Sequence, residues 1–312
     1  MTSHSGFVAV IGRPNVGKST LINAFLGQKV AAVSPRAQTT RRRQMGILTN
    51  DACQIVFVDT PGLHQARHKL GEYLNQEAEE ALQGVDVILW LIDASVGPHE
   101  EDRRIAALLA GLRRRPTLYI GLNKIDLIPA EQIPVKIQAC AELITVVEQG
   151  RDKDAEIFPI SATNGKGRGE LLQSLIAKMP EREPEFEEEQ ITDFYERDIA
   201  ADLIREACLH HLREEIPHGV NIRIDEFTER SERGAYIAAT VFVERESHKG
   251  IVIGEGGGML KKIGSAARAE IESMSGRKVF LELRVKVEKD WRDDENILRR
   301  FGYKIEKKKK RK

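Results

Sequence analysis

Short apolar runs alternate with segments of helical periodicity along the first 180 residues. The runs occupy residues 7–12, 54–59, 86–93, 117–122 and 156–160. Each run has the length of a buried strand, and the segments between runs are long enough for the helices that connect parallel strands. Residues 45–50 are expected to form an edge strand. The pattern predicts an α/β domain built on a parallel sheet.

The pattern changes after residue 180. Residues 180–189 are rich in Glu and Pro and have no periodicity, which indicates a linker. The expected elements beyond it are an amphipathic helix and then three strands, at residues 194–212, 219–224, 236–243 and 278–289. The predicted domains are an α/β domain over 1–180, an acidic linker over 181–192, a smaller α+β domain over 193–303 and a basic tail over 304–312.

Charge is distributed unevenly along the 312 residues. The formal net charge is zero, but residues 240–312 carry 20 Lys and Arg against 12 Asp and Glu, a net of +8. The first 239 residues carry 28 against 36, a net of −8. Opposite signs in the two halves predict that the C-terminal half meets a polyanion. The tail has seven basic residues, which could add RNA affinity, bind anionic lipid or simply be solvated.

Cysteine use and hydropathy point to the cytoplasm. The three cysteines have no C-x-x-C spacing, so neither a disulfide framework nor a zinc site is expected. The N-terminus lacks a charged segment followed by an apolar one, and no apolar run approaches the ~18 residues of a spanning helix. We therefore expect a cytoplasmic protein, with peripheral contact at the inner face of the membrane as an alternative.

The first chemical motif follows the apolar run at 7–12. Gly12 to Ser19 match G-x-x-x-x-G-K-[ST], a loop whose backbone N–H groups and lysine surround phosphates at a helix N-terminus. The alternative is an ordinary strand-to-helix turn. The residues expected to bind nucleotide here are consecutive: Gly12, Arg13, Pro14, Asn15, Val16, Gly17, Lys18, Ser19 and Thr20.

Selectivity for a base is encoded downstream, in Asn123-Lys124-Ile125-Asp126. A carboxylate at Asp126 can accept hydrogen bonds from the ring N–H and the amino group of guanine, and adenine has neither donor in those positions. We expect Asn123 to hold the base from another edge and the stem of Lys124 to lie over its face. Ser161 and Ala162 follow the next strand, and the Ala162 N–H could bind the guanine carbonyl. The motifs together predict GTP and GDP as ligands.

Between these motifs, Asp59, Thr60, Pro61 and Gly62 end another apolar run. An acidic residue there can hold Mg²⁺, and a glycine N–H can contact the γ-phosphate. Residues 36–43 are polar and rich in arginine, and a threonine in them can reach the metal; we favour Thr40 over Thr39. The predicted metal ligands are Ser19, Thr40 and Asp59, and the predicted catalytic residues are Lys18, Thr40 and Gly62.

A second glycine-rich segment lies in the C-terminal half, between two apolar helical turns. A G-x-x-G loop between two helices is typical of KH domains, where backbone approaches the sugar-phosphate of about four nucleotides. A plain helix-turn-helix is the alternative. Glu255 is unusual, because basic residues are typical between these glycines. The residues expected to contact RNA are Ile253, Gly254, Glu255, Gly256, Gly257, Lys261 and Lys262.

The motifs in this order resemble the translation-factor-related GTPases, and Arg-Pro-Asn-Val-Gly-Lys-Ser-Thr with Gln-Thr-Thr-Arg is similar to their Era and TrmE-like branch. A G domain followed by a type II KH domain resembles the Era family over nearly the whole chain. The resemblance implies a Ras-like P-loop fold, slow GTP hydrolysis, binding of the 3′ end of 16S rRNA and a role in assembly of the 30S subunit. It also implies that Asn15 could help to hold K⁺; we further expect a monomer.

The motifs provide no side chain that would orient the attacking water. Leu63 occupies the position where Ras-like proteins have the glutamine that orients the attacking water. His64 is adjacent, although a solvated loop histidine is the simpler interpretation. Two other functions therefore stay open: an RNA-modification GTPase of the TrmE type, and a nucleotide-gated RNA-binding protein with negligible hydrolysis.

Overall fold

The computed structural model describes residues 4–34, 40–51, 53–114, 116–148, 155–231 and 234–303. Its contacts divide the chain into two compact units. Unit 1 comprises Met1–Val33, Arg43–Gln65 and Glu77–Phe194, and unit 2 comprises Ser34–Arg42, Ala66–Gln76 and Tyr195–Lys312. Two short segments from the first third of the chain thus belong to the same unit as the C-terminal third. The candidates Thr39 and Lys304–Lys312 lie outside the described residues.

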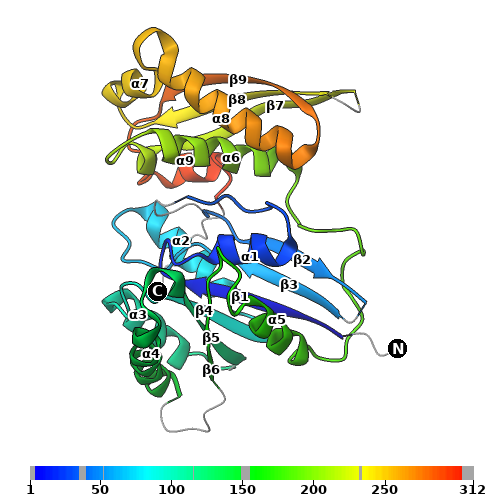
Figure 1. The fold of residues 1–312 in the computed structure, drawn as a ribbon. Coiled ribbons are helices and arrows are strands. Elements are labelled where there is room, and N and C mark those ends of the chain that lie inside the picture. The colour runs from blue at the N-terminus through cyan, green and yellow to red at the C-terminus, as the bar shows by residue number, and fades with distance from the viewer. Residues whose placement is uncertain are drawn as a thin grey trace, which may run out of the picture. The chain divides into compact units, whose positions relative to one another are not determined.

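Unit 1 contains, within the described residues, one six-stranded sheet in the order β2-β3-β1-β4-β5-β6 (Figure 1). The strands are β1 (His4–Gly12), β2 (Gln44–Thr49), β3 (Cys53–Asp59), β4 (Val87–Asp93), β5 (Thr117–Asn123) and β6 (Glu156–Pro159). All neighbours are parallel except β2 and β3. β2 is last in the strand order on one side, so the predicted edge strand is confirmed. β3 and β4 are buried along their whole length, which explains their continuous apolar runs.

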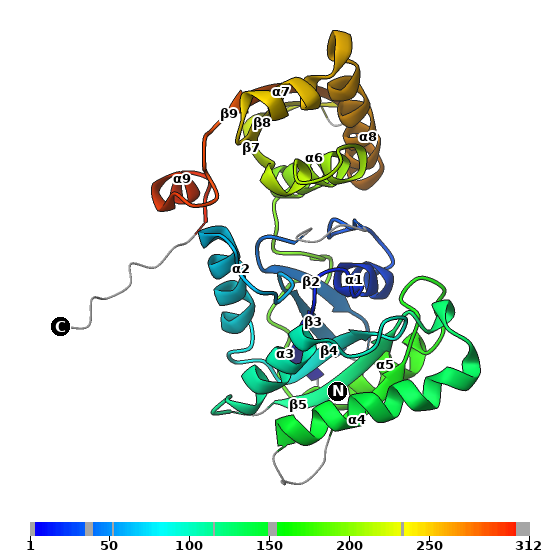
Figure 2. The ribbon, with the colours of Figure 1, turned by 90° about the vertical axis from the view of Figure 1, so that its left-hand side faces the viewer.

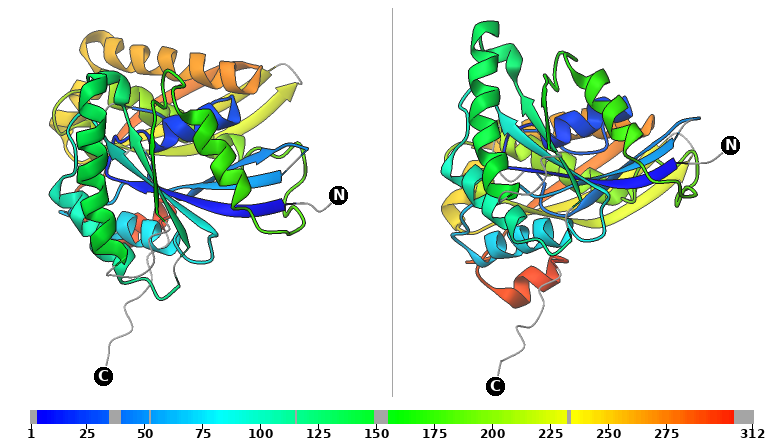
Figure 3. Two further views of the ribbon diagram at one scale, coloured as in Figure 1. Left: turned by 60° about the horizontal axis from the view of Figure 1, so that its bottom comes forward. Right: turned by 90° about the horizontal axis from the view of Figure 1, so that it is seen from below.

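Helices cover both faces of this sheet (Figure 3). They are α1 (Lys18–Leu26), α2 (Lys69–Glu80), α3 (Glu100–Ala110), α4 (Ile133–Glu148) and α5 (Arg168–Ala177), with short 3₁₀ turns η1 (Ile125–Leu127) and η2 (Ala130–Gln132). One buried cluster joins α1 and α5 to the sheet, and another joins α3 and α4 to its opposite face. Helix α2 begins in unit 2 and ends in unit 1. The predicted α/β domain built on a parallel sheet is confirmed.

The acidic segment after residue 180 is held against unit 1. The fully buried amide of Gln54 donates to the Phe186 carbonyl at 2.9 Å and accepts from the N–H groups of Glu185 and Phe186. The Ile47 N–H donates to the Ile191 carbonyl. Sequence pattern suggested a solvated linker here, but a single buried glutamine and the edge strand bind its backbone.

Unit 2 contains a three-stranded sheet among its described residues, in the order β7-β8-β9. Its strands are β7 (Asn221–Ser231), β8 (Gly234–Val243) and β9 (Lys278–Val287); its helices are α6 (Glu196–His211), η3 (Pro217–Gly219), α7 (Glu246–Ile253), η4 (Glu255–Gly257), α8 (Gly258–Ser275) and α9 (Glu295–Arg300). Helices α6 and α8 lie against the sheet (Figure 2). Helix α7, the glycine loop and α8 follow β8 directly, as the KH pattern predicts.

A cluster of large side chains joins the second of the two inserted segments, Ala66–Gln76, to the rest of unit 2. It contains Leu70, Tyr73, Leu74, Phe242, Trp291, Leu298, Phe301 and Tyr303. Trp291 is fully buried and donates its ring N–H to the Gly219 carbonyl at 2.9 Å. No described helix is both long and apolar enough to cross a membrane.

Candidate nucleotide and RNA sites

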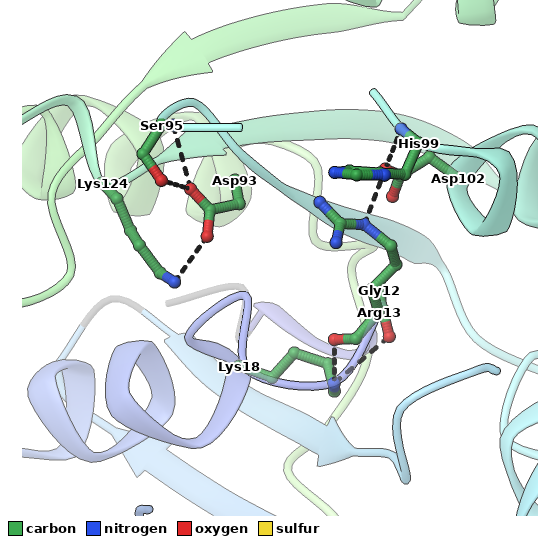
Figure 4. Close-up of polar contacts among 8 residues, drawn as sticks. All are labelled: Gly12, Arg13, Lys18, Asp93, Ser95, His99, Asp102 and Lys124. Atoms are coloured by element: carbon green, nitrogen blue, oxygen red, sulfur yellow. Dashed lines mark hydrogen bonds and ion pairs between the residues drawn. The ribbon is translucent and has the colours of Figure 1, made fainter. Parts of the chain in front are cut away.

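The glycine-rich loop after β1 surrounds a buried lysine. The Lys18 ammonium donates to the carbonyls of Gly12 at 3.2 Å and Arg13 at 3.0 Å (Figure 4). Burial lowers the pKa of Lys18 to about 8, although the nearby Asp59 charge acts to raise it. A buried cation whose hydrogen bonds go to neutral carbonyls gains strongly from an anionic ligand. This loop is therefore electrostatically suited to phosphate.

Two glycines allow the close approaches that build the loop. Gly17 has φ +100°, and a Cβ there would overlap the side-chain amide of Asn123. A Cβ on Gly62 would lie 2.6 Å from the Pro14 nitrogen. The structure thus brings the loop into contact with both downstream motifs, one at each end. Of the remaining loop residues, Val16 is buried, Thr20 is half-buried in α1, and Asn15 is exposed with φ +63°.

Two of the three predicted metal ligands contact each other. The Ser19 hydroxyl donates to Asp59 Oδ2 at 2.6 Å, between the start of α1 and the end of β3. A hydroxyl and a carboxylate are the oxygen donors that Mg²⁺ prefers, with waters and phosphate oxygens completing its coordination. No group of three or more His, Cys, Asp or Glu among the described residues could hold a metal. The residues present therefore fit a cation that the nucleotide itself helps to bind.

The segment after Asp59 is fixed by backbone contacts. The Thr60 hydroxyl donates to the Val10 carbonyl at 2.8 Å, and the Leu63 N–H donates to the Gly12 carbonyl at 3.3 Å. Pro61 is buried. Leu63 itself is only 8% exposed and packs in the core with α2 and α3. Its side chain is a packing group in this structure, and His64 Nδ1 lies 2.9 Å from the Gly62 carbonyl.

The predicted base-binding residues meet at the carboxyl end of β5. The Asn123 amide donates to the Val16 carbonyl at 2.7 Å, and its oxygen accepts from the Ala162 N–H at 2.9 Å. Asn123 thus joins its own motif to the phosphate loop and to the Ser161–Ala162 segment. The Ala162 N–H, predicted to meet guanine, is donated to Asn123 in this structure. Ser161 is fully buried, whereas Asp126 is exposed in η1, where a base can reach it.

An ion pair that sequence reasoning missed supports the phosphate loop. Arg13 Nε donates to Asp102 Oδ2 at 2.7 Å, and the same oxygen accepts the His99 N–H that begins α3 (Figure 4). Asp102 is fully buried, and burial raises the pKa of its carboxyl group. The two residues are 89 positions apart. No local pattern could have paired them.

The second candidate site is the loop between α7 and α8. Gly254, Glu255, Gly256 and Gly257 connect the two helices, so the G-x-x-G register runs from 254 to 257. Gly254 has φ +73° and ψ 171°, a conformation that is essentially limited to glycine. Glu255 and Gly256 are exposed. The loop presents its backbone to solvent.

The neighbouring side chains of this loop are cationic on the α8 side. Lys261 and Lys262 are both exposed in the first turns of α8, and Ile253 is half-buried at the end of α7. An apolar surface, open backbone and lysines are the components with which KH domains bind single-stranded RNA. All seven predicted RNA-binding residues thus lie in one helix-loop-helix segment.

Thr40, the third predicted metal ligand, belongs to unit 2 and precedes a buried arginine. Arg41 is 4% exposed; it donates to the carbonyls of Val220 at 2.8 Å and His218 at 3.1 Å. Its guanidinium lies 5.4 Å from the centre of the Trp291 ring. Sequence reasoning did not single out Arg41, since an arginine-rich stretch usually indicates a solvated loop.

Fold and sites define a class: a P-loop nucleotide-binding domain joined to a KH domain. A family model described as 50S ribosome-binding GTPase matches residues 7–124, and one described as KH domain matches residues 215–292. GTPase Era of Ruminiclostridium cellulolyticum is 44% identical over 307 residues, which cover 98% of this chain and 100% of that protein. The chain belongs to the Era family of GTPases.

Two solved structures are similar over the same extent. A crystal structure of Era in complex with MgGDPNP and nucleotides 1506–1542 of 16S ribosomal RNA is 38% identical, with a TM-score of 0.89. A single-residue variant of Aquifex aeolicus Era bound to GDP and AlF₄⁻ is also 38% identical, with a TM-score of 0.88. Each comparison covers 97% of this chain and 100% of the other. The predicted Ras-like G domain followed by a KH domain is confirmed.

Proposed function

We propose that this protein is a GTP-hydrolysing switch that binds the 3′ end of 16S rRNA through its KH domain and acts in assembly of the 30S subunit. One observation carries the proposal: a phosphate loop with a guanine-type base end and an open KH loop occur in a single chain. A similar protein is known in complex with both MgGDPNP and a 16S rRNA segment. The family membership supports the same pairing of ligands.

The roles of the nucleotide residues follow from their chemistry. Lys18 and the loop N–H groups bind phosphate, and Asp126 accepts hydrogen bonds from guanine. Ser19, Thr40 and Asp59 would hold Mg²⁺, which supplies charge neutralisation between the phosphates. Gly62 stands beside Pro14, where its N–H can meet the terminal phosphate. We propose that the remaining nucleotide-binding residues are Gly12, Arg13, Pro14, Asn15, Val16, Gly17, Thr20, Thr60, Pro61, Asn123, Lys124, Ser161 and Ala162.

Hydrolysis proceeds without a side chain at position 63 that orients water, because Leu63 is part of the core. Asn15 is exposed in the phosphate loop and could hold K⁺ beside the phosphates, in place of a catalytic side chain. Turnover should then be faster in potassium than in sodium buffer at equal ionic strength. Equal rates in the two buffers would remove potassium from the mechanism.

Coupling between nucleotide binding and RNA binding is supported by two segments near the nucleotide motifs, Ser34–Arg42 and Ala66–Gln76, which belong to unit 2. Arg41 follows Thr40 and is bound to backbone carbonyls beside β7. The Leu70 N–H at the start of α2 donates to the Arg292 carbonyl, and His68 pairs with Asp293 at 2.8 Å. A movement of Thr40 or Gly62 on GTP binding would therefore be transmitted to elements that pack with the KH sheet. By linkage, GTP and RNA would raise each other's affinity.

On the RNA side, we propose that Ile253, Gly254, Glu255, Gly256, Gly257, Lys261 and Lys262 form the contact surface. We propose that the protein is a cytoplasmic monomer. Its family is proposed to belong to the wider Era and TrmE-like branch of GTPases. Peripheral association with the membrane through residues 304–312 remains part of the proposal. A tail deletion that leaves binding to anionic vesicles unchanged would argue against it.

The deciding experiment compares two RNAs and two nucleotides. Affinity is measured for a short RNA with the 3′ terminus of 16S rRNA and for a scrambled strand, with protein loaded with GDPNP or GDP. Tight, sequence-dependent binding that GDPNP favours is expected. Equal affinity for the two RNAs, and equal affinity with GDPNP and GDP, would overturn the proposal. A turnover assay with and without RNA separates the switch from a binding protein with negligible hydrolysis, and an RNA-modification assay tests the TrmE-type alternative.

A further inference from the structure

A buried carboxylate outside the guanine motif binds the lysine of that motif. Asp93 is the last residue of β4, and its Oδ2 lies 2.5 Å from the Lys124 ammonium. Its other oxygen accepts the Ser95 hydroxyl at 2.5 Å and the Ser95 N–H at 2.9 Å. Figure 4 shows Asp93 between these two partners. The nucleotide set derived above includes neither Asp93 nor Ser95.

The sheet register explains why these groups meet. Asp93 pairs with Asn123 in the parallel ladder between β4 and β5, so it stands beside the residue that precedes Lys124. The Ala94 N–H donates to the Asn123 carbonyl at 2.8 Å and fixes the two strand ends together. Lys124 adopts a left-handed backbone conformation, with φ +67° and ψ 32°. The turn of the chain therefore sends its side chain back toward β4.

The hydrogen bonds to Asp93 keep its carboxylate charged and so maintain its ion pair with Lys124. Burial acts to raise the pKa of Asp93, but the hydrogen bonds from Lys124 and Ser95 outweigh it and hold the pKa below its usual value. The carboxylate is therefore charged at neutral pH. A free lysine would have to give up rotamer freedom when its stem packs on a ligand. A lysine whose ammonium is already bound has lost much of that freedom before the ligand arrives.

We propose that Asp93 is a positioning residue for the guanine base: it holds the Lys124 ammonium so that the lysine stem is already in place to cover the base. The inference rests on the proposed guanine-nucleotide function. Asp93 acts on the base end alone, so it affects GTP and GDP alike. It has no part in the choice between bases, which belongs to Asp126.

The chain offers a matched control at the opposite end of the same strand. Asp86 directly precedes β4 and is 11% exposed in its side chain, the same value as Asp93. It accepts the Phe7 N–H at 2.9 Å and pairs with Arg182 at 3.5 Å. Both carboxylates have one backbone donor and one cation, and Asp93 has the Ser95 hydroxyl in addition. Asp93→Asn and Asp86→Asn remove equivalent charges, but only one lies beside the guanine motif.

The first test measures affinity for fluorescent GDP and GTP together with steady-state turnover. D93N should weaken both nucleotides about 10-fold through faster dissociation, raise KM and leave kcat at saturating GTP unchanged. The ratio of GTP to ITP affinity should stay as in the wild type, since ITP lacks only the amino group that Asp126 recognises. D86N should bind both nucleotides normally. Equal behaviour of D93N and D86N would overturn the inference.

A double substitution tests whether Asp93 acts through the lysine. Lys124→Met keeps the stem and removes the ammonium, so adding D93N to K124M should cause no further loss of affinity. An additional 10-fold loss in the double variant would show that Asp93 acts by another route and would contradict the proposal. If the wild type bound no guanine nucleotide, the proposed function itself would fail. Normal wild-type binding with an unaffected D93N would reject only the positioning role.

Discussion

Two glycine-rich loops in this protein are built in opposite ways. In the phosphate loop, glycines are needed because other atoms occupy the space of a side chain: the amide of Asn123 at Gly17, and the backbone of Leu91 at Gly12. In the KH loop, a Cβ on Gly256 or Gly257 would meet nothing within 4 Å. The first loop is enclosed and contains a buried lysine. The second is open and presents backbone to solvent.

This difference matches the shapes of the two proposed ligands. A triphosphate is compact and highly charged, so an enclosing loop can surround it with N–H groups and a desolvated cation. A polynucleotide extends beyond any pocket, so its backbone needs an open surface over about four nucleotides. Substitutions should therefore be far more damaging in the first loop. The following predictions test this contrast, from the largest expected effect to the smallest.

Gly17→Ala should reduce affinity for GTP and GDP at least about 100-fold. The new Cβ displaces the Asn123 amide, which costs its bond to Val16, and adds left-handed strain; the two effects cost roughly 1–3 kcal/mol each. Titration with fluorescent GDP measures the loss. Gly27→Ala is the control, because Gly27 also has positive φ but its Cβ would meet nothing. Similar losses in both variants would show that strain, and not enclosure, sets the cost.

Local patterns predicted the strands of unit 1 well because each apolar run coincides with one strand, apart from single residues at the ends of two runs. The nucleotide motifs follow strand ends, so their convergence at one sheet edge could also be foreseen. Contacts between distant residues could not. Three such contacts depend on which distant segments the fold brings together. They are the ion pair between Arg13 and Asp102, the hydrogen bond from Arg41 to the Val220 carbonyl, and the hydrogen bond from Gln54 to the Phe186 carbonyl.

The direction of the Leu63 side chain could not be predicted from the sequence either. Its position next to Gly62 suggested a place near the attacking water, and the sequence offered no sign that the side chain turns into the core. The direction of a side chain in a loop depends on the volume left by helices that are distant in sequence, here α3. Motif spacing therefore locates a functional segment, while packing decides which of its side chains can take part.

Gly254→Ala should weaken RNA binding about 20-fold. Gly254 is the one position of the KH loop where a side chain is excluded, because a Cβ would lie 2.7 Å from Met259 Cβ. The backbone conformation of this residue adds a strain of about 1–3 kcal/mol for any other amino acid. Fluorescence anisotropy with a short single-stranded RNA measures the change. Gly256→Ala, at φ +56° with open space, should bind within about threefold of the wild type; a loss equal to that of Gly254→Ala would contradict the open-loop description.

Nucleotide affinity should fall about tenfold between pH 7 and 9. Lys18, with a pKa near 8 in the free protein, loses its charge over this range, and phosphate binds the charged form. Binding should take up a proton, which calorimetry in two buffers of different ionisation enthalpy detects. The unfolded chain keeps an ordinary lysine pKa, so stability of the nucleotide-free protein should rise with pH between about 8 and 10.5. A constant affinity and no proton uptake would mean that Lys18 stays charged.

Glu255→Gln should strengthen RNA binding about threefold at low salt. Glu255 is exposed between the loop glycines, where its charge repels the phosphate backbone. Because exposed charges are screened within about 10 Å at 0.1 M salt, the gain should shrink as salt rises. Affinity measured at two salt concentrations checks both effects. Glu246→Gln is the control, since its side chain is 77% exposed at the start of α7, outside the loop. An equal gain in both variants would show that the charge of the whole surface, and not that of the loop, sets the repulsion. If only Glu255→Gln gains affinity, one carboxylate in an open loop tunes RNA affinity without disturbing the fold.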